Sequence, residues 1–100
     1  MSLVLAGQVR FAPELIAEAE TAMVELMRAT RRQDGCISSV YSRDLAEPGL
    51  YRVYQVWRDE TSFDAHHEGP HFDRWREARV RLGMHDRSYW LHEIAATHDA

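Results

Sequence analysis

The sequence contains no lysine and no asparagine, so all 12 of its Lys and Arg positions are arginines. Without lysine the chain cannot form a Schiff base, and it lacks the lysine of a Walker-type phosphate loop. Neither G-x-G-x-x-G nor G-x-S-x-G occurs, and the five glycines are scattered along the chain. The sequence therefore excludes Schiff-base chemistry and gives no support to a nucleotide loop or a serine-hydrolase site.

Cysteine is also scarce, because Cys36 is the only one. A single cysteine cannot form an internal disulfide, so there is no signature of an oxidising compartment. Cys36 lies where a turn leads into a predicted strand, which favours a small buried hydrophobe over a reactive thiol. No apolar run approaches the roughly 18 residues of a membrane span, and residues 1–11 lack the pattern of a signal peptide. We therefore expect a cytoplasmic protein.

Net charge argues against a nucleic-acid partner, because the chain carries -4 at pH 7 and phosphate binding needs a basic excess. The arginines near the last helix alternate with Asp73 and Glu77, which predicts a solvated, self-paired helix face: Arg74, Arg76, Arg79 and Arg81. With 45% hydrophobic and 28% charged residues, the composition is that of an ordinary globular protein. We expect one domain over residues 1–100.

Hydrophobic periodicity predicts four strands, at residues 3–11, 37–45, 50–57 and 86–96. Apolar residues three and four apart predict a long helix that starts at Pro13, fades through residues 30–32 and stops before Gly35. A second helical segment is interrupted at Gly69-Pro70 and runs on to about Leu82.

The predicted order is β-α-β-β-α-β. Right-handed crossovers place both helical segments on one face of a four-stranded antiparallel sheet, which is a ferredoxin-like α+β fold. The half-polar strand at residues 37–45 is expected near a sheet edge, in a hairpin closed by the turn at residues 47–49. Gly7 marks a position where another segment can approach the first strand closely.

The strand at residues 50–57 (LYRVYQVW) is largely apolar on both of its faces. This pattern is typical of a strand that is covered on both sides. Because the helices can cover only one side of the sheet, we expect a second copy of the chain on the other, in a homodimer formed sheet to sheet.

Three histidines follow this strand: His66, His67 and His71. Their spacing does not indicate a metal site, because Gly69-Pro70 interrupts the helix and no cysteine or acidic ligand stands at a familiar offset. We therefore predict no bound metal. A single histidine can instead act as a general base if it lies in a pocket that tunes its pKa.

His66 is the predicted base. Asp59 can cap the short helix that carries it, and adjacent helical residues diverge by about 100°. Phe63, three residues before His66, marks the inward side of that helix, so His67 should face outward. The alternatives for removing a proton from the substrate are Tyr54, His71 and the substrate's own acidity.

Aromatic side chains are expected first of all in the core. They can also line a flat slot for a planar polycyclic or quinol-like ligand, with a few polar contacts. The predicted lining comprises Trp57, Phe63, Phe72, Trp75 and Trp90, with Gln8, Tyr54, His71 and Arg76.

Three segments together resemble the antibiotic biosynthesis monooxygenase family, in particular its small quinol-monooxygenase-like members: QDGC at residues 33–36, YRVYQVWRD at 51–59, and F-x-A-H…G-P-H-F at 63–72. The resemblance implies a dimeric α+β barrel and oxygenation of an electron-rich aromatic substrate by O₂ without metal, haem or flavin. The haem-degrading branch of the family has an Asn where Gln8 stands and a Trp where His66 stands, and Arg76 lies near the place of its catalytic His. The resemblance therefore does not extend to haem degradation.

Two other functions are consistent with the same residues. One is a dimeric small-molecule-binding or stress-associated protein without catalysis, since a fold does not determine a function. The other is a cofactor-free isomerase that uses the same histidine without O₂. Consumption of O₂ separates these alternatives from a monooxygenase.

Overall fold

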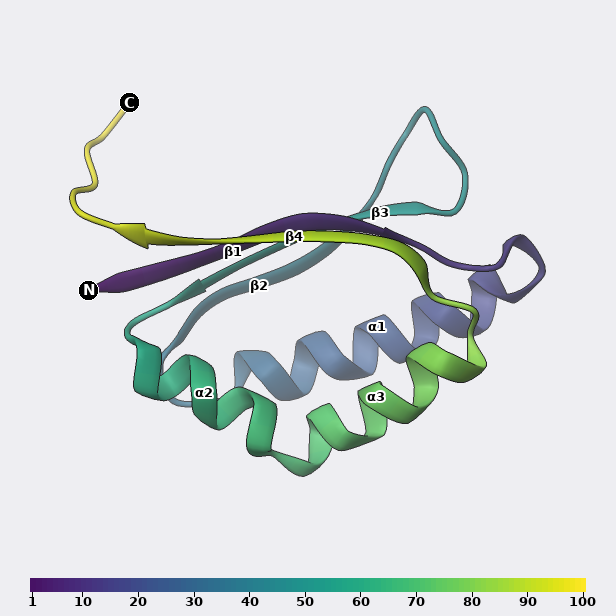
Figure 1. Ribbon diagram of the computed structural model, residues 1–100, viewed down its shortest axis with the longest axis horizontal. Coiled ribbons are helices and arrows are strands. Elements are labelled where there is room, and N and C mark those ends of the chain that lie inside the picture. Colours follow the sequence, from purple (N-terminus) through teal and green to yellow (C-terminus); the bar gives the residue numbers. More distant parts are fainter.

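The computed structural model describes residues 1–100, and all of its helices lie on one face of a four-stranded antiparallel sheet (Figure 1). The strands are β1 (Ser2–Arg10), β2 (Cys36–Arg43), β3 (Leu50–Trp57) and β4 (His85–Ile94), in the spatial order β2-β3-β1-β4. The helices are α1 (Ile16–Arg31), α2 (Glu60–Glu68) and α3 (Pro70–Arg81). The predicted ferredoxin-like order is confirmed, with its second helical segment divided into α2 and α3.

The helix ends follow local sequence signals. Pro13 opens a 3-10 turn, η1 (Pro13–Leu15), so that α1 starts three residues later than predicted. Such tight turns are frequent at helix starts. After α1, Gly35 adopts a φ of 85°, which is the left-handed stop that the sequence indicates. Pro70 occupies the first turn of α3, where its missing N–H leaves no partner unsatisfied.

The hairpin between β2 and β3 is confirmed, with β2 at the sheet edge. Its loop is held by the Asp44 carboxylate, which accepts hydrogen bonds from the N–H groups of Ala46 and Glu47 at 3.1 and 2.8 Å. At the opposite edge, β4 ends at Ile94, two residues earlier than predicted. No helix of the structure is long and apolar enough to cross a membrane.

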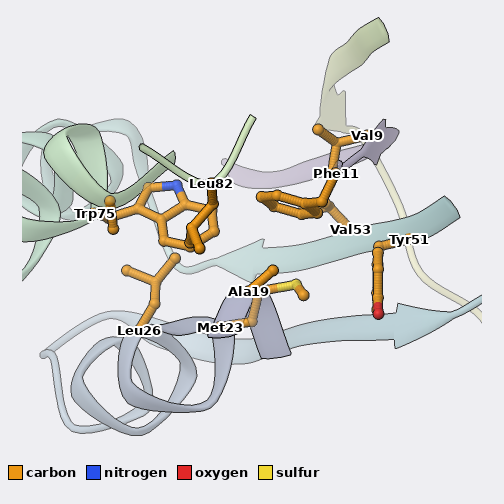
Figure 2. Close-up of a cluster of buried hydrophobic side chains, with 10 residues drawn as sticks. Val9, Phe11, Ala19, Met23, Leu26, Tyr51, Val53, Trp75 and Leu82 are labelled. Carbon is orange, nitrogen blue, oxygen red and sulfur yellow. The ribbon is translucent and has the colours of Figure 1, made fainter. Parts of the chain in front are cut away.

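The core lies between the helices and the inner face of the sheet (Figure 2). The inner face of β3 carries Tyr51, Val53, Gln55 and Trp57, each at most 3% exposed. Trp75 of α3 is the central aromatic residue, because its ring centroid lies 6.2 Å from that of Phe11 and 5.6 Å from that of Tyr41. The side chains that surround it come from β1, α1, β3 and the end of α3: Val9, Met23, Leu26, Val53 and Leu82.

The opposite face of the sheet is covered by no element of this chain (Figure 1). Ala6 lies at its centre and pairs with Tyr54 of β3 on one side and Trp90 of β4 on the other. Tyr54 is 48% exposed and Trp90 is 64% exposed. This outer face therefore presents two large aromatic side chains to solvent.

Gly7 is the position of close approach that the sequence indicates. A Cβ atom there would lie 2.2 Å from the Ser88 carbonyl oxygen and 2.6 Å from Cδ1 of Tyr89. The ring of Tyr89 thus occupies the space that a side chain at residue 7 would need, and only glycine fits.

Replacing Gly7→Ala should therefore lower the free energy of unfolding by about 3 kcal/mol, because the added methyl group overlaps backbone as well as side-chain atoms. Urea denaturation measures this loss. Ala6→Gly is the matched control one residue away, with an expected loss of about 1 kcal/mol from backbone flexibility. Equal losses in the two variants would contradict the packing argument.

Candidate active site

The site is built at the junction of β3 and α2. Asp59 has extended backbone geometry and caps α2, and its Oδ1 accepts a hydrogen bond from the Ser62 N–H at 2.8 Å. That hydrogen bond, followed by the Arg58 guanidinium, lowers the pKa of Asp59 to about 2. Arg58 also pairs with Asp34 at 3.0 Å, which ties the start of α2 to the loop after α1. The rotational position of α2 is therefore set at its first residue.

This position turns His66 inward. The side chain is 1% exposed, and its ring centroid lies 5.0 Å from that of Trp57 and 5.0 Å from that of Phe72. Trp57 is fully buried beneath it and donates its indole N–H to Oε1 of Gln55 at 3.0 Å. His66 therefore lies against the inner face of the sheet, within a cluster of aromatic rings.

The Nδ1 atom of His66 has two polar neighbours. It lies 3.1 Å from Nε2 of His71 and 3.3 Å from Oε1 of Gln33. The Gln33 side chain comes from the loop after α1 and donates its amide N–H to the Ser62 carbonyl at 3.4 Å. Two neutral imidazoles in such contact share a single N–H between the facing nitrogens, so the protonation states of His66 and His71 are linked.

Burial, followed by the neighbouring His67 and His71, lowers the pKa of His66 to about 3. Burial also lowers the pKa of His71, with contributions from Arg74 and Arg32. His66 is thus neutral at physiological pH and able to accept a proton. Its protonated form is costly in this environment unless an anion forms beside it.

His67 lies half-buried between two phenylalanine rings, with centroid distances of 4.6 Å to Phe63 and 4.7 Å to Phe72. Its Nδ1 donates to the Phe63 carbonyl oxygen at 2.9 Å, which leaves Nε2 as a free acceptor. The sequence predicts an outward position for this residue. The contact was not predicted because a hydrogen bond from residue 67 to the carbonyl of residue 63 depends on the helix geometry and the side-chain rotamer.

Arg76 completes this edge of the cluster. Its guanidinium carbon lies 4.6 Å from the Phe72 ring centroid, and one nitrogen donates to the His67 carbonyl at 3.0 Å. The other nitrogen pairs with Asp73 at 2.9 Å, so the self-paired helix face is confirmed at this position. The structure brings together the following predicted residues: Trp57, Phe63, His66, His71, Phe72 and Arg76.

Three predicted members of the slot lie on the other side of the sheet. Tyr54, Gln8 and Trp90 lie on the outer face of the sheet, where Gln8 accepts a hydrogen bond from Arg52. Side chains alternate along a strand, so Tyr54 and Trp57, three residues apart, point to opposite faces. Trp75 is on the correct side but is used in the core near Phe11.

The histidine cluster does not form a cation site. No group of three or more His, Cys, Asp or Glu side chains is arranged to hold a metal ion. What the arrangement offers is a buried neutral imidazole against an apolar aromatic wall, with a second imidazole in contact with its Nδ1.

A family model described as antibiotic biosynthesis monooxygenase matches residues 2–78. The chain belongs to this family. An uncharacterised protein of Synechocystis sp. is 25% identical over 95 residues, which are 95% of this chain. The chain spans 65% of the length of that relative.

Solved structures share the fold of this family member. One of them is a crystal structure from Deinococcus radiodurans, described as a candidate antibiotic biosynthesis monooxygenase, with a TM-score of 0.91 at 22% identity. The alignment covers 98% of this chain and 97% of the Deinococcus chain. A variant of SnoaB, a cofactor-independent oxygenase from Streptomyces nogalater, has a TM-score of 0.79 at 20% identity. That alignment covers 96% of this chain and 95% of SnoaB. At these identities the likeness establishes the α+β fold.

The buried His66 makes the stability of this family member dependent on pH. Its folded pKa of about 3 lies below the ordinary 6.5, so between these values only the unfolded chain takes up the proton. Stability from this residue is complete above pH 6.5 and is lost as the pH falls toward 3. Lowering the pH from about 7.5 to about 5 should lower the free energy of unfolding by about 2 kcal/mol through His66. His66→Gln should abolish this part of the pH dependence.

Urea unfolding at the two pH values measures the difference between the wild type and the variant. His98→Gln, in the exposed residues after β4, is the control and should keep the full dependence. The same pH dependence in wild type and His66→Gln would show that His66 is not buried in its neutral form.

Proposed function

We propose that this protein is a cofactor-independent monooxygenase that oxidises an electron-rich aromatic substrate, of the quinol, polyphenol or anthrone class, with O₂. The observation that carries the proposal is the burial of His66 among Trp57, Phe63 and Phe72. Family membership supports it, as does the likeness to SnoaB, a cofactor-independent oxygenase. An aromatic wall suits a planar substrate, and a buried neutral imidazole suits proton abstraction.

The chemistry needs a base, a dry cavity and alignment. In an anthrone, His66 accepts a proton from the reacting carbon, which leaves an electron-rich anion. This anion passes one electron to O₂, and the resulting radical pair combines to form a peroxide. The proton on His66 returns to the outer oxygen of this peroxide anion, and the resulting hydroperoxide loses water together with the remaining hydrogen of the reacting carbon. One oxygen atom therefore remains as a carbonyl on the substrate and the other leaves as H₂O.

The low pKa of His66 has a mechanistic consequence under this proposal. Its protonated form is disfavoured in the free protein because it is buried. The substrate anion formed in the first step is the partner that would stabilise that proton, since opposite charges a few ångströms apart interact strongly in an apolar site. Proton transfer would thus be coupled to a substrate in the correct position. We assign Phe63, Phe72 and Trp57 to substrate contact, with His71 and Arg76 at the margin.

The low basicity of free His66 also favours a second candidate, a small-molecule-binding protein of the same fold without catalysis. A cofactor-free isomerase would transfer the proton without O₂. Uptake of O₂ and the product mass across a panel of quinols and anthrones decide among the three. A gain of one oxygen atom supports the monooxygenase, whereas ligand binding or isomerisation without O₂ uptake contradicts it.

On a substrate found in this panel, His66→Gln should lower turnover by about 10²- to 10⁴-fold, the usual contribution of a general base. Glutamine keeps much of the volume and a hydrogen-bonding group, so a retained thermal unfolding midpoint separates chemistry from misfolding. His67→Gln is the matched comparison and should cause a much smaller loss. Equal losses in the two variants would move the assignment away from His66.

Turnover should persist in the presence of EDTA and without added flavin, because the proposed chemistry uses only the protein, the substrate and O₂. Oxygen uptake before and after chelation measures this. Loss of turnover with EDTA and its recovery with one particular metal would contradict cofactor independence.

We also propose that the protein is a homodimer joined through the outer face of the sheet. The solvent-exposed Trp90 and Tyr54 on that face support the proposal. Val56 lies on the same face of β3 as Tyr54 and is half-buried. Large aromatic side chains on a continuous face are typical of protein interfaces. A cytoplasmic location remains an expectation from the sequence.

Introducing a charge into this face with Trp90→Arg should therefore convert a dimer into a monomer of 11.6 kDa, because two guanidinium groups would be buried without partners. Light scattering at micromolar concentration gives the mass of each form. Leu45→Arg is the control, because Leu45 is fully exposed in the hairpin loop and outside the sheet. A monomeric wild-type protein would overturn the proposal.

A further inference from the structure

A groove lies on the helical side of the molecule, between α1 and α3. It has a volume of about 300 Å³. That volume lies at the lower end of the roughly 300–1,000 Å³ range of small-molecule sites. Its apolar floor is formed by small side chains and one aromatic ring: Ala22, Leu26, Ala29, Trp75 and Ala78. Figure 2 shows Leu26 of α1 pointing toward the Trp75 ring of α3, and both residues line this groove.

The rim of the groove is cationic. Arg28 and Arg32 line it from the α1 side and Arg74 from α3, whereas Glu25 is its one carboxylate. The ion pairs of the chain are made by other arginines: Arg10, Arg43, Arg52, Arg58 and Arg76. The three groove arginines are therefore free to bind an external anion. Arg74 was predicted to belong to a self-paired helix face, and for this residue the prediction is wrong because it makes no ion pair.

His71 lines the groove as well and faces two of these cations. Both Arg74 and Arg32 are close enough to contribute to the lowered pKa of its imidazole. On its other side, Nε2 of His71 lies 3.1 Å from Nδ1 of His66. The groove and the aromatic cluster thus meet at one imidazole pair.

We propose that this groove binds a small organic anion, with its carboxylate or sulfonate group between Arg32 and Arg74 and its apolar body over the alanines and Trp75. Two guanidinium groups supply donors that match a planar oxyanion. The apolar floor explains why the ligand is organic, because an inorganic ion would leave that surface without a partner. The volume limits the body to one or two rings or a short chain.

The bound anion also acts on His71. A negative charge beside this imidazole favours its protonated form. The titratable and charged groups that face the imidazole are Arg74 on α3, Arg32 after α1 and His66 on α2, and Glu25 and Arg28 lie further along the groove. Because His71 contacts His66, occupancy of the groove and the protonation of the histidine pair are coupled reciprocally.

The test uses the full chain with ¹³C-labelled alanine methyl groups and ¹⁵N-labelled imidazoles. Naphthoate is the probe, naphthamide is its neutral isostere, and inorganic phosphate tests for a simple anion site. Naphthoate should shift the methyl signals of Ala22, Ala29 and Ala78 in a saturable manner and raise the pKa of His71. Naphthamide should bind at least tenfold more weakly. Equal effects of naphthoate and naphthamide, binding of phosphate as tight as that of naphthoate, or no saturable shift would overturn the proposal.

The matched variants separate this site from general surface charge. Arg32→Gln combined with Arg74→Gln should weaken naphthoate binding about tenfold or more, because both charged donors to the carboxylate are removed. Arg81→Gln removes one exposed arginine of α3 that does not line the groove and should leave binding unchanged. Equal weakening by Arg81→Gln would contradict the assignment. None of these readouts depends on catalytic activity, so the test is independent of the proposed reaction.

Discussion

The hydrogen bond from the Ser62 N–H to the Asp59 carboxylate sets the geometry on which the rest of the site depends. Successive helical residues are separated by about 100°, so the first residue of α2 determines which of two adjacent histidines faces the sheet. Starting the helix one residue later would turn His67 toward Trp57 and His66 outward. Arg58 reinforces the start of α2 by pairing with Asp34 and Asp59. A short capped helix thus fixes the orientation of His66 more closely than a loop would.

Burial then gives the inward histidine its chemical character. The packing that places His66 against Trp57 also removes water from its ring, and the lowered pKa follows from that desolvation. Such a residue is neutral and poorly basic until an anion forms next to it. His71 lies at the boundary between this cluster and the arginine-lined groove. The imidazole pair therefore joins a cluster of aromatic rings with a cationic groove suited to anions.

Periodicity and turn signals were sufficient to predict the order of the elements, the hairpin, the edge position of β2 and the close approach at Gly7, because each depends on local chemistry. The candidate site was predicted only in part. His66, Phe63 and Phe72 lie within one short stretch, so their proximity follows from helix geometry. Tyr54 and Trp90 were placed on the wrong face although strand alternation separates Tyr54 from Trp57, and only the register shows that both aromatic residues flank Ala6.

The sequence by itself determined the class of fold, the capped helix after the third strand and the inward position of His66, since these depend on spacing along a few residues. Only the tertiary structure decided which distant groups meet. Gln33 reaches His66 across 33 positions of the chain, and Arg32, at the end of α1, comes close to His71 of α3. Contacts of this kind depend on how helices cross and which rotamers the packing allows, and no local pattern records them.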